Sequence, residues 1–184
     1  MNLNKELITK VLFSNKNILI KFIKDITNID YKLLKENLII EKSLTLKYGK
    51  NKYIELEVNN QSYTGMILKN LFAGYQVLNS NKKIIKIVIT SFDYEEKSLI
   101  KYKIDEERID TNSKNEYIFY LLNISKCIEL YSNNKKDNHL NYIYWGSLLS
   151  CNNIDDIFKI ASNILNKEEI DIIIKTLKKE IISI

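Results

Sequence analysis

Two carboxylates and an amide alternate with apolar residues in the stretch IELEVNNQ, residues 54–61. Glu55, Glu57 and Asn59 occupy every second position, and an apolar residue stands between neighbours in this series. This period of two predicts a β-strand with one apolar and one polar face. Carboxylate and amide oxygens are ligands that Mg²⁺ accepts, and a bound Mg²⁺ can activate water for phosphodiester hydrolysis. The polar face is therefore either a candidate metal site or a solvated strand face.

A second strand is expected beside this one, because Gly49, Lys50 and Asn51 form a turn signal. A three-residue loop at 50–52 would place Thr45 opposite Glu57, on the same polar face. A metal-dependent nuclease needs a second carboxylate at such a position, and the residue there is threonine. From the residues alone, a solvated strand face is the favoured interpretation.

Hydrophobic periodicity and turn residues predict the elements that position these side chains. Apolar residues at helical spacing over 18–26 predict an amphipathic helix, and a break at Ser14 or Asn15 separates it from a shorter helix before it. A nearly continuous β-branched run over 84–92 predicts a central strand buried on both faces. The polar stretch 105–115 predicts an exposed loop.

The other expected elements are shorter or have weaker signals. They are strands over 38–41, 44–48, 53–59, 99–104 and 117–124, helices over 67–78, 142–149 and 154–165, and a last helix that begins after the N-cap residue Asn166. The order through residue 92 is αβββαβ. It predicts an α/β fold in which helices flank a mixed sheet, followed by a C-terminal helical extension.

Charge composition narrows the classes of function. Lysine and arginine number 28 against 23 acidic residues, and this net charge of +5 permits nucleic-acid contact without arguing strongly for it. Arg108 is the single arginine. Because arginine is the usual reader of guanine edges, a sequence-specific DNA reader is disfavoured, while phosphate contact through lysine stays open.

The cysteines, the histidine and the tryptophan give no sign of a catalytic or zinc site. Cys127 and Cys151 lie in no metal-ligand spacing, and with His139 as the single histidine no Cys/His zinc site can form. Both thiols are expected to be reduced and buried, and Trp145 is expected in the core. With no signal-peptide pattern and no apolar run of membrane-spanning length, a cytoplasmic location without membrane contact is expected.

Taken in order, the segments of the chain resemble the Rpn (recombination-promoting nuclease) family, also described as PD-(D/E)XK nuclease family transposases. The resemblance rests on the ordered series and not on any single motif. The matching segments are 4–13 (NKELITKVLF), 33–41 (LLKENLIIE), 43–47 (SLTLK), 54–59 (IELEVN), 66–75, 84–92 (IIKIVITSF), 122–127 (LNISKC) and 142–149 (YIYWGSLL). It implies a PD-(D/E)XK nuclease-like core over residues 1–125 and a C-terminal helical region over 126–184 packed on the same domain.

The resemblance also shows where the chain departs from the family. The aspartate of the second strand falls on Thr45, the Glu-x-Gln ending becomes Glu57-Val58-Asn59, and the later glutamate falls on Asn123. The carboxylates left for Mg²⁺ are Glu57 and Glu6, with Glu55 as a local substitute. Since Mg²⁺ prefers charged, hard oxygen ligands, nuclease activity is expected to be severely impaired or absent.

The sequence therefore predicts a degenerate nuclease-like protein of phage or mobile-element type that acts by binding, with a role in defence against phage or in countering it. Its partner would be a nucleic acid, a related nuclease or a defence effector complex. Nucleic-acid contact is expected at lysines near the core, namely Lys69, Lys82, Lys83 and Lys86. The alternatives are an active Mg²⁺-dependent DNA endonuclease and a scaffold that forms a homo-oligomer through its C-terminal helices.

Overall fold

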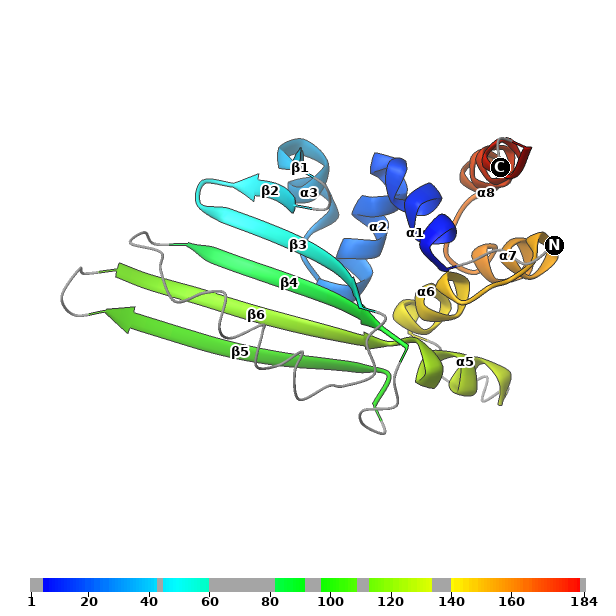
Figure 1. Ribbon diagram of the computed structural model, residues 1–184. Coiled ribbons are helices and arrows are strands. Elements are labelled where there is room, and N and C mark those ends of the chain that lie inside the picture. The colour runs from blue at the N-terminus through cyan, green and yellow to red at the C-terminus, as the bar shows by residue number, and fades with distance from the viewer. Residues whose placement is uncertain are drawn as a thin grey trace. The chain divides into compact units, whose positions relative to one another are not determined.

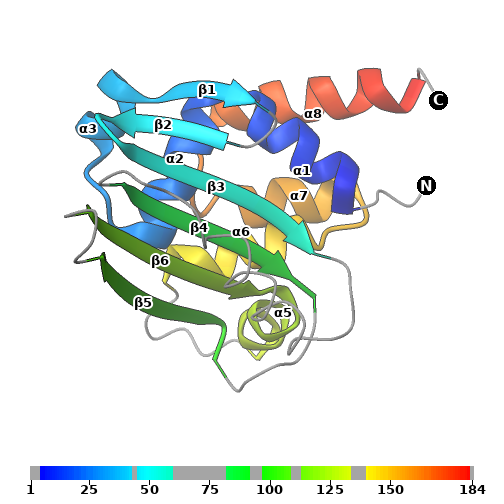
Figure 2. The same cartoon turned by 60° about the vertical axis from the view of Figure 1, so that its left-hand side comes forward.

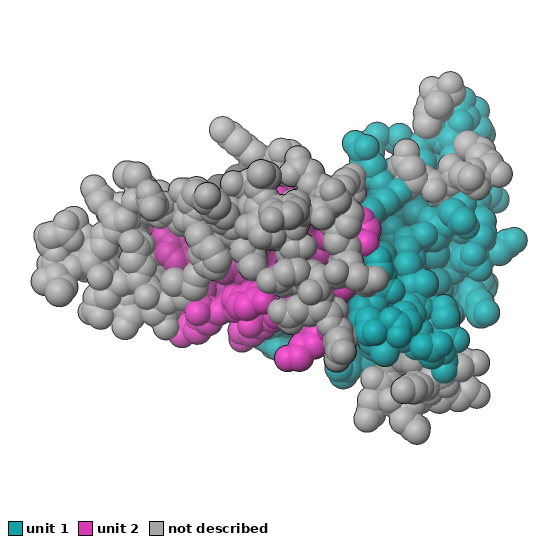
Figure 3. All heavy atoms as spheres, turned by 60° about the horizontal axis from the view of Figure 1, so that its bottom comes forward, with its two compact units in different colours: residues 1–35, 124–184 teal, residues 36–123 magenta. Residues whose placement is uncertain are grey.

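The computed structural model describes residues 5–42, 45–59, 82–91, 97–108, 113–133 and 140–182. The chain forms two compact units, which Figure 3 distinguishes by colour. The helical unit consists of residues 1–35 and 124–184, and the sheet unit consists of residues 36–123. The expected division at residue 125 rests on the family resemblance and stays a prediction. In the structure, residues 124–184 group with the N-terminal helices.

The helical unit brings together both ends of the chain (Figure 1). Its helices are α1 (Lys5–Ser14), α2 (Lys16–Thr27), α3 (Tyr31–Asn37, which continues into the sheet unit), α5 (Ile124–Ser132), α6 (Asn141–Leu149), α7 (Ile154–Ala161) and α8 (Lys167–Ile182). Within the described part of the chain, no helix has both the length and the apolar character needed to cross a membrane.

Asn15 separates α1 from α2, as the sequence predicts. Its side-chain oxygen accepts hydrogen bonds from the backbone N–H groups of Asn17 at 3.0 Å and Ile18 at 3.3 Å, which caps the start of α2. Helix α2 ends at Asn28, whose φ of 58° lies in the left-handed region that asparagine tolerates. The predicted break thus arises from an N-cap, and the chain needs no proline to make it.

Trp145 lies in the core of the helical unit, which confirms the expectation for this residue. It is fully buried, and its ring meets Phe22 edge-on with 5.5 Å between centroids. The indole N–H donates a 2.9 Å hydrogen bond to Asp25, so the polar atom of this buried ring is satisfied. These contacts join α2 to α6.

Helix α8 begins with a capping box. The Asn166 side chain accepts from the backbone N–H of Glu169, and the Glu169 carboxylate accepts from the backbone N–H of Asn166, both at 2.9 Å. Glu169 also pairs with Lys21 of α2 at 2.6 Å. The expected N-cap at Asn166 is confirmed, and the same carboxylate holds α8 to α2.

The sheet unit contains one mixed sheet, which confirms the expected α/β class. Its strands are β1 (Ile39–Lys42), β2 (Thr45–Gly49), β3 (Lys52–Asn59), β4 (Lys83–Thr90), β5 (Leu99–Arg108) and β6 (Ser113–Asn123). They lie in the order β1-β2-β3-β4-β6-β5, from β1 at one edge to β5 at the other (Figure 2). Strands β1, β2 and β3 are antiparallel, β4 is parallel to β3 and β6, and β5 is antiparallel to β6.

Strand β4 is buried on both faces, as its β-branched sequence predicts. Consecutive residues Ile87, Val88 and Ile89 have no exposed surface. The strand begins where the Lys83 N–H donates to the carbonyl of Asn51 at 2.9 Å. The parallel pairing with β3 requires a crossover, and the helix predicted over 67–78 lies outside the described residues.

One local prediction is wrong, and two helices are missing from the expected elements. Residues 105–115 are not simply a loop, because β5 continues to Arg108 and β6 begins at Ser113. This polar end of the hairpin is held by the ladder of backbone hydrogen bonds, which hydrophobic periodicity does not detect. Helix α3 has only seven residues, too few for a clear helical periodicity, and α5 begins directly after the apolar strand β6, so the strand expected over 117–124 hides its start.

Candidate functional site

Glu55 and Glu57 project from the same face of β3, as their spacing predicts. We call this the mixed face, because apolar residues of β4 and β6 share it with polar residues of β2, β3 and β4. Its described polar members include Thr45, Lys47, Glu55, Glu57 and Lys86, and its apolar members include Ile84, Val88, Tyr117, Phe119 and Leu121. Both carboxylates are partly buried.

The predicted partner of Glu57 across the hairpin is wrong. Thr45 lies opposite Glu55, not opposite Glu57. The turn consists of two residues, Lys50 and Asn51, because Gly49 pairs with Lys52 and Asn51 adopts a φ of 57°. A bulge between Lys47 and Gly49 contributes the rest of the difference. The observed register differs from the predicted one by two residues along β3. Because side chains alternate between the two faces of a strand, Thr45 remains on the mixed face.

An ion pair on the mixed face joins β4 to β3. The ammonium of Lys86 lies 2.6 Å from Oε2 of Glu57. The lysine side chain is 17% exposed and the glutamate side chain is 39% exposed. In the parallel register Lys86 aligns with Glu55 on one side and with buried Phe119 on the other. Its ammonium therefore contacts the carboxylate of Glu57, while its backbone lies level with Glu55.

These residues do not fit a Mg²⁺ site of the kind that the family resemblance implies. The donors on the mixed face are two carboxylates, and the third position carries a neutral hydroxyl at Thr45. Lys86 and Lys47 offset the charge of Glu55 and Glu57, so an incoming cation gains little attraction. Within the described part of the chain, no group of three or more His, Cys, Asp or Glu residues could hold a metal ion.

The other predicted site residues do not extend this arrangement. Glu6 is exposed on α1, in the helical unit. Asn59 is the last residue of β3 and pairs with Thr90 of β4, while its side chain and all of Lys69 lie outside the described structure. The part of the proposed metal set that the sheet unit brings together is thus Glu55 and Glu57.

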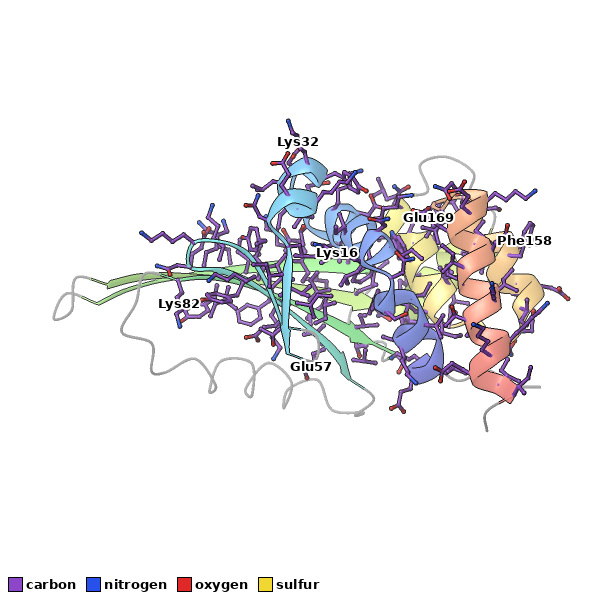
Figure 4. The ribbon with its side chains drawn as sticks, turned by 90° about the horizontal axis from the view of Figure 1, so that it is seen from above. Lys16, Lys32, Glu57, Lys82, Phe158 and Glu169 are labelled. Carbon is purple, nitrogen blue, oxygen red and sulfur yellow. The ribbon has the colours of Figure 1, made fainter. Side chains whose placement is uncertain are left out.

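The three described lysines of the expected nucleic-acid surface do not form one surface. Lys83 and Lys86 point to opposite faces of β4, because they are three residues apart in a strand. Lys82 precedes the strand and lies over the ring of Tyr53, 5.7 Å from its centroid. Figure 4 labels Lys82 and Glu57 at separate places on the sheet unit.

Lys83 belongs to a second charge cluster on the opposite face. Glu116 of β6 accepts from Lys83 at 2.8 Å and from Lys103 at 3.2 Å. The hydrogen bond from Lys83 is the main cause that holds the pKa of Glu116 below its ordinary value. Burial, followed by the charge of Glu116, raises the pKa of nearby Tyr48 to about 12. The cluster ties the start of β4 to β5 and β6.

Neither cysteine has the environment of a nucleophile. Both are buried free thiols, as expected. Burial raises the pKa of Cys127 to about 12, and burial together with the charge of Asp156 does the same for Cys151. A thiol with such a pKa stays protonated at neutral pH, so it is unreactive.

The sequence pointed to Lys86 as a contact for nucleic acid, not as the partner of Glu57. The sequence indicates only that Lys86 and Glu57 both stand between apolar residues of predicted strands. It does not indicate that they form an ion pair. The register of β3 against β4 depends on the connection between these parallel strands. The length of that connection does not tell which residues will pair.

No protein-family model, no curated protein and no solved structure matches this chain.

Proposed function

We propose that this chain is a degenerate PD-(D/E)XK nuclease-like protein, of phage or mobile-element type, that acts by binding and not by catalysis. The observation that carries the proposal is the ion pair between Lys86 and Glu57, 2.6 Å long, at the carboxylate to which the family resemblance assigns a metal-binding role. A carboxylate paired with a lysine is a poor ligand for Mg²⁺, because the metal must displace a cation that is already in contact.

Two further features support this reading. The residue opposite Glu55 is Thr45, which has no charge to offer a metal. The strand order also agrees with the expected core, because an antiparallel hairpin region leads into a strand that returns parallel to β3. A frame of this kind with altered site residues is what the resemblance predicts for a protein that has kept the fold and lost the reaction.

A protein is the better candidate for the partner. Lys82, Lys83 and Lys86 each contact an aromatic ring or a carboxylate of the same unit, so the lysines expected to bind phosphate are engaged within the chain. Strand β1, at the edge of the sheet, carries Ile39 and Ile40 with 60% and 51% of their surface exposed. An exposed apolar edge strand is suited to pairing with an extended segment of another protein, such as a related nuclease or a component of a defence complex.

A cleavage assay tests the absence of catalysis. The purified chain is incubated with supercoiled plasmid and Mg²⁺ or Mn²⁺, with the variant Glu57→Ala as a matched control for contaminating nuclease. We expect no nicking above the level of the variant. Metal-dependent cleavage that disappears in Glu57→Ala would instead establish the alternative, an active endonuclease.

Photo-crosslinking in the native host tests the kind of partner. A crosslinking amino acid at Ile40 is compared with one at Phe158, a similarly exposed apolar residue of α7 (Figure 4). We expect a protein adduct at position 40 that survives nuclease treatment and is absent at position 158. An adduct to nucleic acid, or one that nuclease treatment abolishes, would reverse the choice of partner.

A further inference from the structure

We propose that the ammonium of Lys86 is a built-in cation that takes the place of a divalent metal ion between Glu55 and Glu57. The proposal rests on the proposed function, since it concerns the same face of the sheet. It states which group prevents a metal ion from binding there. It also predicts that the closure is reversible: without Lys86, the mixed face should bind a divalent cation.

The backbone places the two carboxylates at a spacing that one cation can bridge. Residues i and i+2 of a strand lie roughly 7 Å apart on one face, and opposite residues of an antiparallel pair lie about 5 Å apart. Glu55 and Glu57 have the first relation, and Thr45 has the second relation to Glu55. Three neighbouring side chains of the mixed face can therefore reach one point above β3.

Lys86 already brings a positive charge to this region. It is aligned with Glu55 in the parallel register, and its ammonium reaches Oε2 of Glu57, two residues further along β3. The lysine side chain therefore runs from the level of Glu55 to the carboxylate of Glu57. A divalent ion that bridged them would need the same space.

The environment of Lys86 explains why its ammonium remains there. The side chain is 17% exposed, and its strand neighbours on the mixed face, Val88 and Phe119, are buried. A largely buried ammonium needs an anionic partner, since desolvation of an unpaired charge is unfavourable. Glu57 is 39% exposed, so the carboxylate side of the pair is open to ions from solvent.

Charge balance decides between the two cations. Glu55 and Glu57 carry two negative charges, and Lys86 and Lys47 carry two positive charges on the same face. Lys82 adds a further positive charge over Tyr53 of this face, so among the described side chains a divalent ion gains no net attraction. Replacing Lys86 by methionine removes the ammonium that contacts Glu57, and adding Thr45→Asp supplies a third carboxylate.

The test is a calorimetric titration of the full chain with MnCl₂. The proteins are the natural chain, Lys86→Met, Thr45→Asp and the double variant. Lys83→Met is the matched control, because it removes the same charge from the opposite face of β4 while Glu116 keeps Lys103. Methionine preserves the length of the side chain and suits apolar neighbours, and Lys86→Gln is a second variant if Lys86→Met does not fold.

We expect saturable Mn²⁺ binding by the double variant with a Kd of about 0.1–1 mM, at least about tenfold tighter than the natural chain, and weaker binding by Lys86→Met alone. Mn²⁺ should raise the melting temperature of these two variants and not that of Lys83→Met. Equal Mn²⁺ affinity of the natural chain and Lys86→Met would overturn the proposal, as would a folded double variant that binds no Mn²⁺. Both of these results concern Mn²⁺ binding and not plasmid cleavage. The proposed function is tested by the cleavage assay, so the two proposals can fail independently.

Discussion

Replacing Gly146 by alanine should destabilise the helical unit, because α5 and α6 cross closely at this residue. A Cβ at position 146 would lie 2.6 Å from the Cβ of Cys127, and closer still to its Sγ. Ordinary contacts between such atoms are about 3.5–4 Å, so the helices would have to separate by about an ångström. The Cβ of Cys127 is fixed to the backbone and cannot move away by a rotamer change.

The expected magnitude follows from two opposing effects. Overpacking of a well-filled core costs up to about 3 kcal/mol, and replacing glycine by alanine within a helix recovers about 1 kcal/mol. We therefore expect the free energy of unfolding to fall by about 2 kcal/mol. With a urea dependence of about 2 kcal/mol/M, the unfolding midpoint should fall by about 1 M.

Urea unfolding followed by tryptophan fluorescence measures this change directly. Trp145 is the only tryptophan, is fully buried and is the neighbour of Gly146, so the signal reports the affected core. Gly49→Ala is the matched control, because its new Cβ would meet Lys52 at an ordinary 3.4 Å and its φ is not positive. Cys127→Ala should rescue Gly146→Ala only in part, since it removes Sγ and leaves Cβ. A Gly146→Ala protein as stable as the natural chain would refute the close crossing.

Two further predictions concern ionisation. Burial raises the pKa values of Cys127 and Cys151 to about 12. Neither thiol should therefore react with iodoacetamide in the native protein at about pH 8, whereas both should react in urea. Mass spectrometry measures the modification, and rapid modification of the native chain would contradict this. Glu116 has a lowered pKa in the folded state, so its stabilising contribution is present above the unfolded value of about 4.3 and is lost as the pH falls through the folded value. The melting temperature of Glu116→Gln should therefore approach that of the natural chain as the pH falls below the unfolded value of about 4.3. The control Glu129→Gln, in an exposed pair with Lys126, should change little, and a Glu116→Gln deficit independent of pH would show that ionisation is not its cause.

The alternation of side chains could be predicted from the sequence with good accuracy. Leu46, Ile54 and Leu56 of β2 and β3 are buried and the polar residues beside them are more exposed, as the period of two requires. The burial of β4 on both faces and the capping at Asn15 and Asn166 also follow from local residue types. These features depend on residues that are close together along the chain, so they can be predicted from the sequence.

The pairings between strands could not be predicted in the same way. A two-residue turn and a bulge after Lys47 moved Thr45 from Glu57 to Glu55, and either change is compatible with the same turn residues. The pairing of Lys86 with Glu57 depends on a register set across a crossover. The shared face of Glu55 and Glu57 on β3 could therefore be predicted, whereas the ion pair of Lys86 with Glu57 came only from the structure.

The helical unit also has a consequence for synthesis on the ribosome. Helix α2 contacts α6 through Phe22 and Trp145, and α8 through Lys21 and Glu169. Helix α2 is made before the sheet unit, whereas α6 and α8 are made after it. The apolar face of α2 must therefore wait, uncovered or held by a chaperone, until residues beyond 140 have left the exit tunnel. A premature stop within the sheet unit should thus release a fragment that quality-control proteases remove, whether or not its strands have paired.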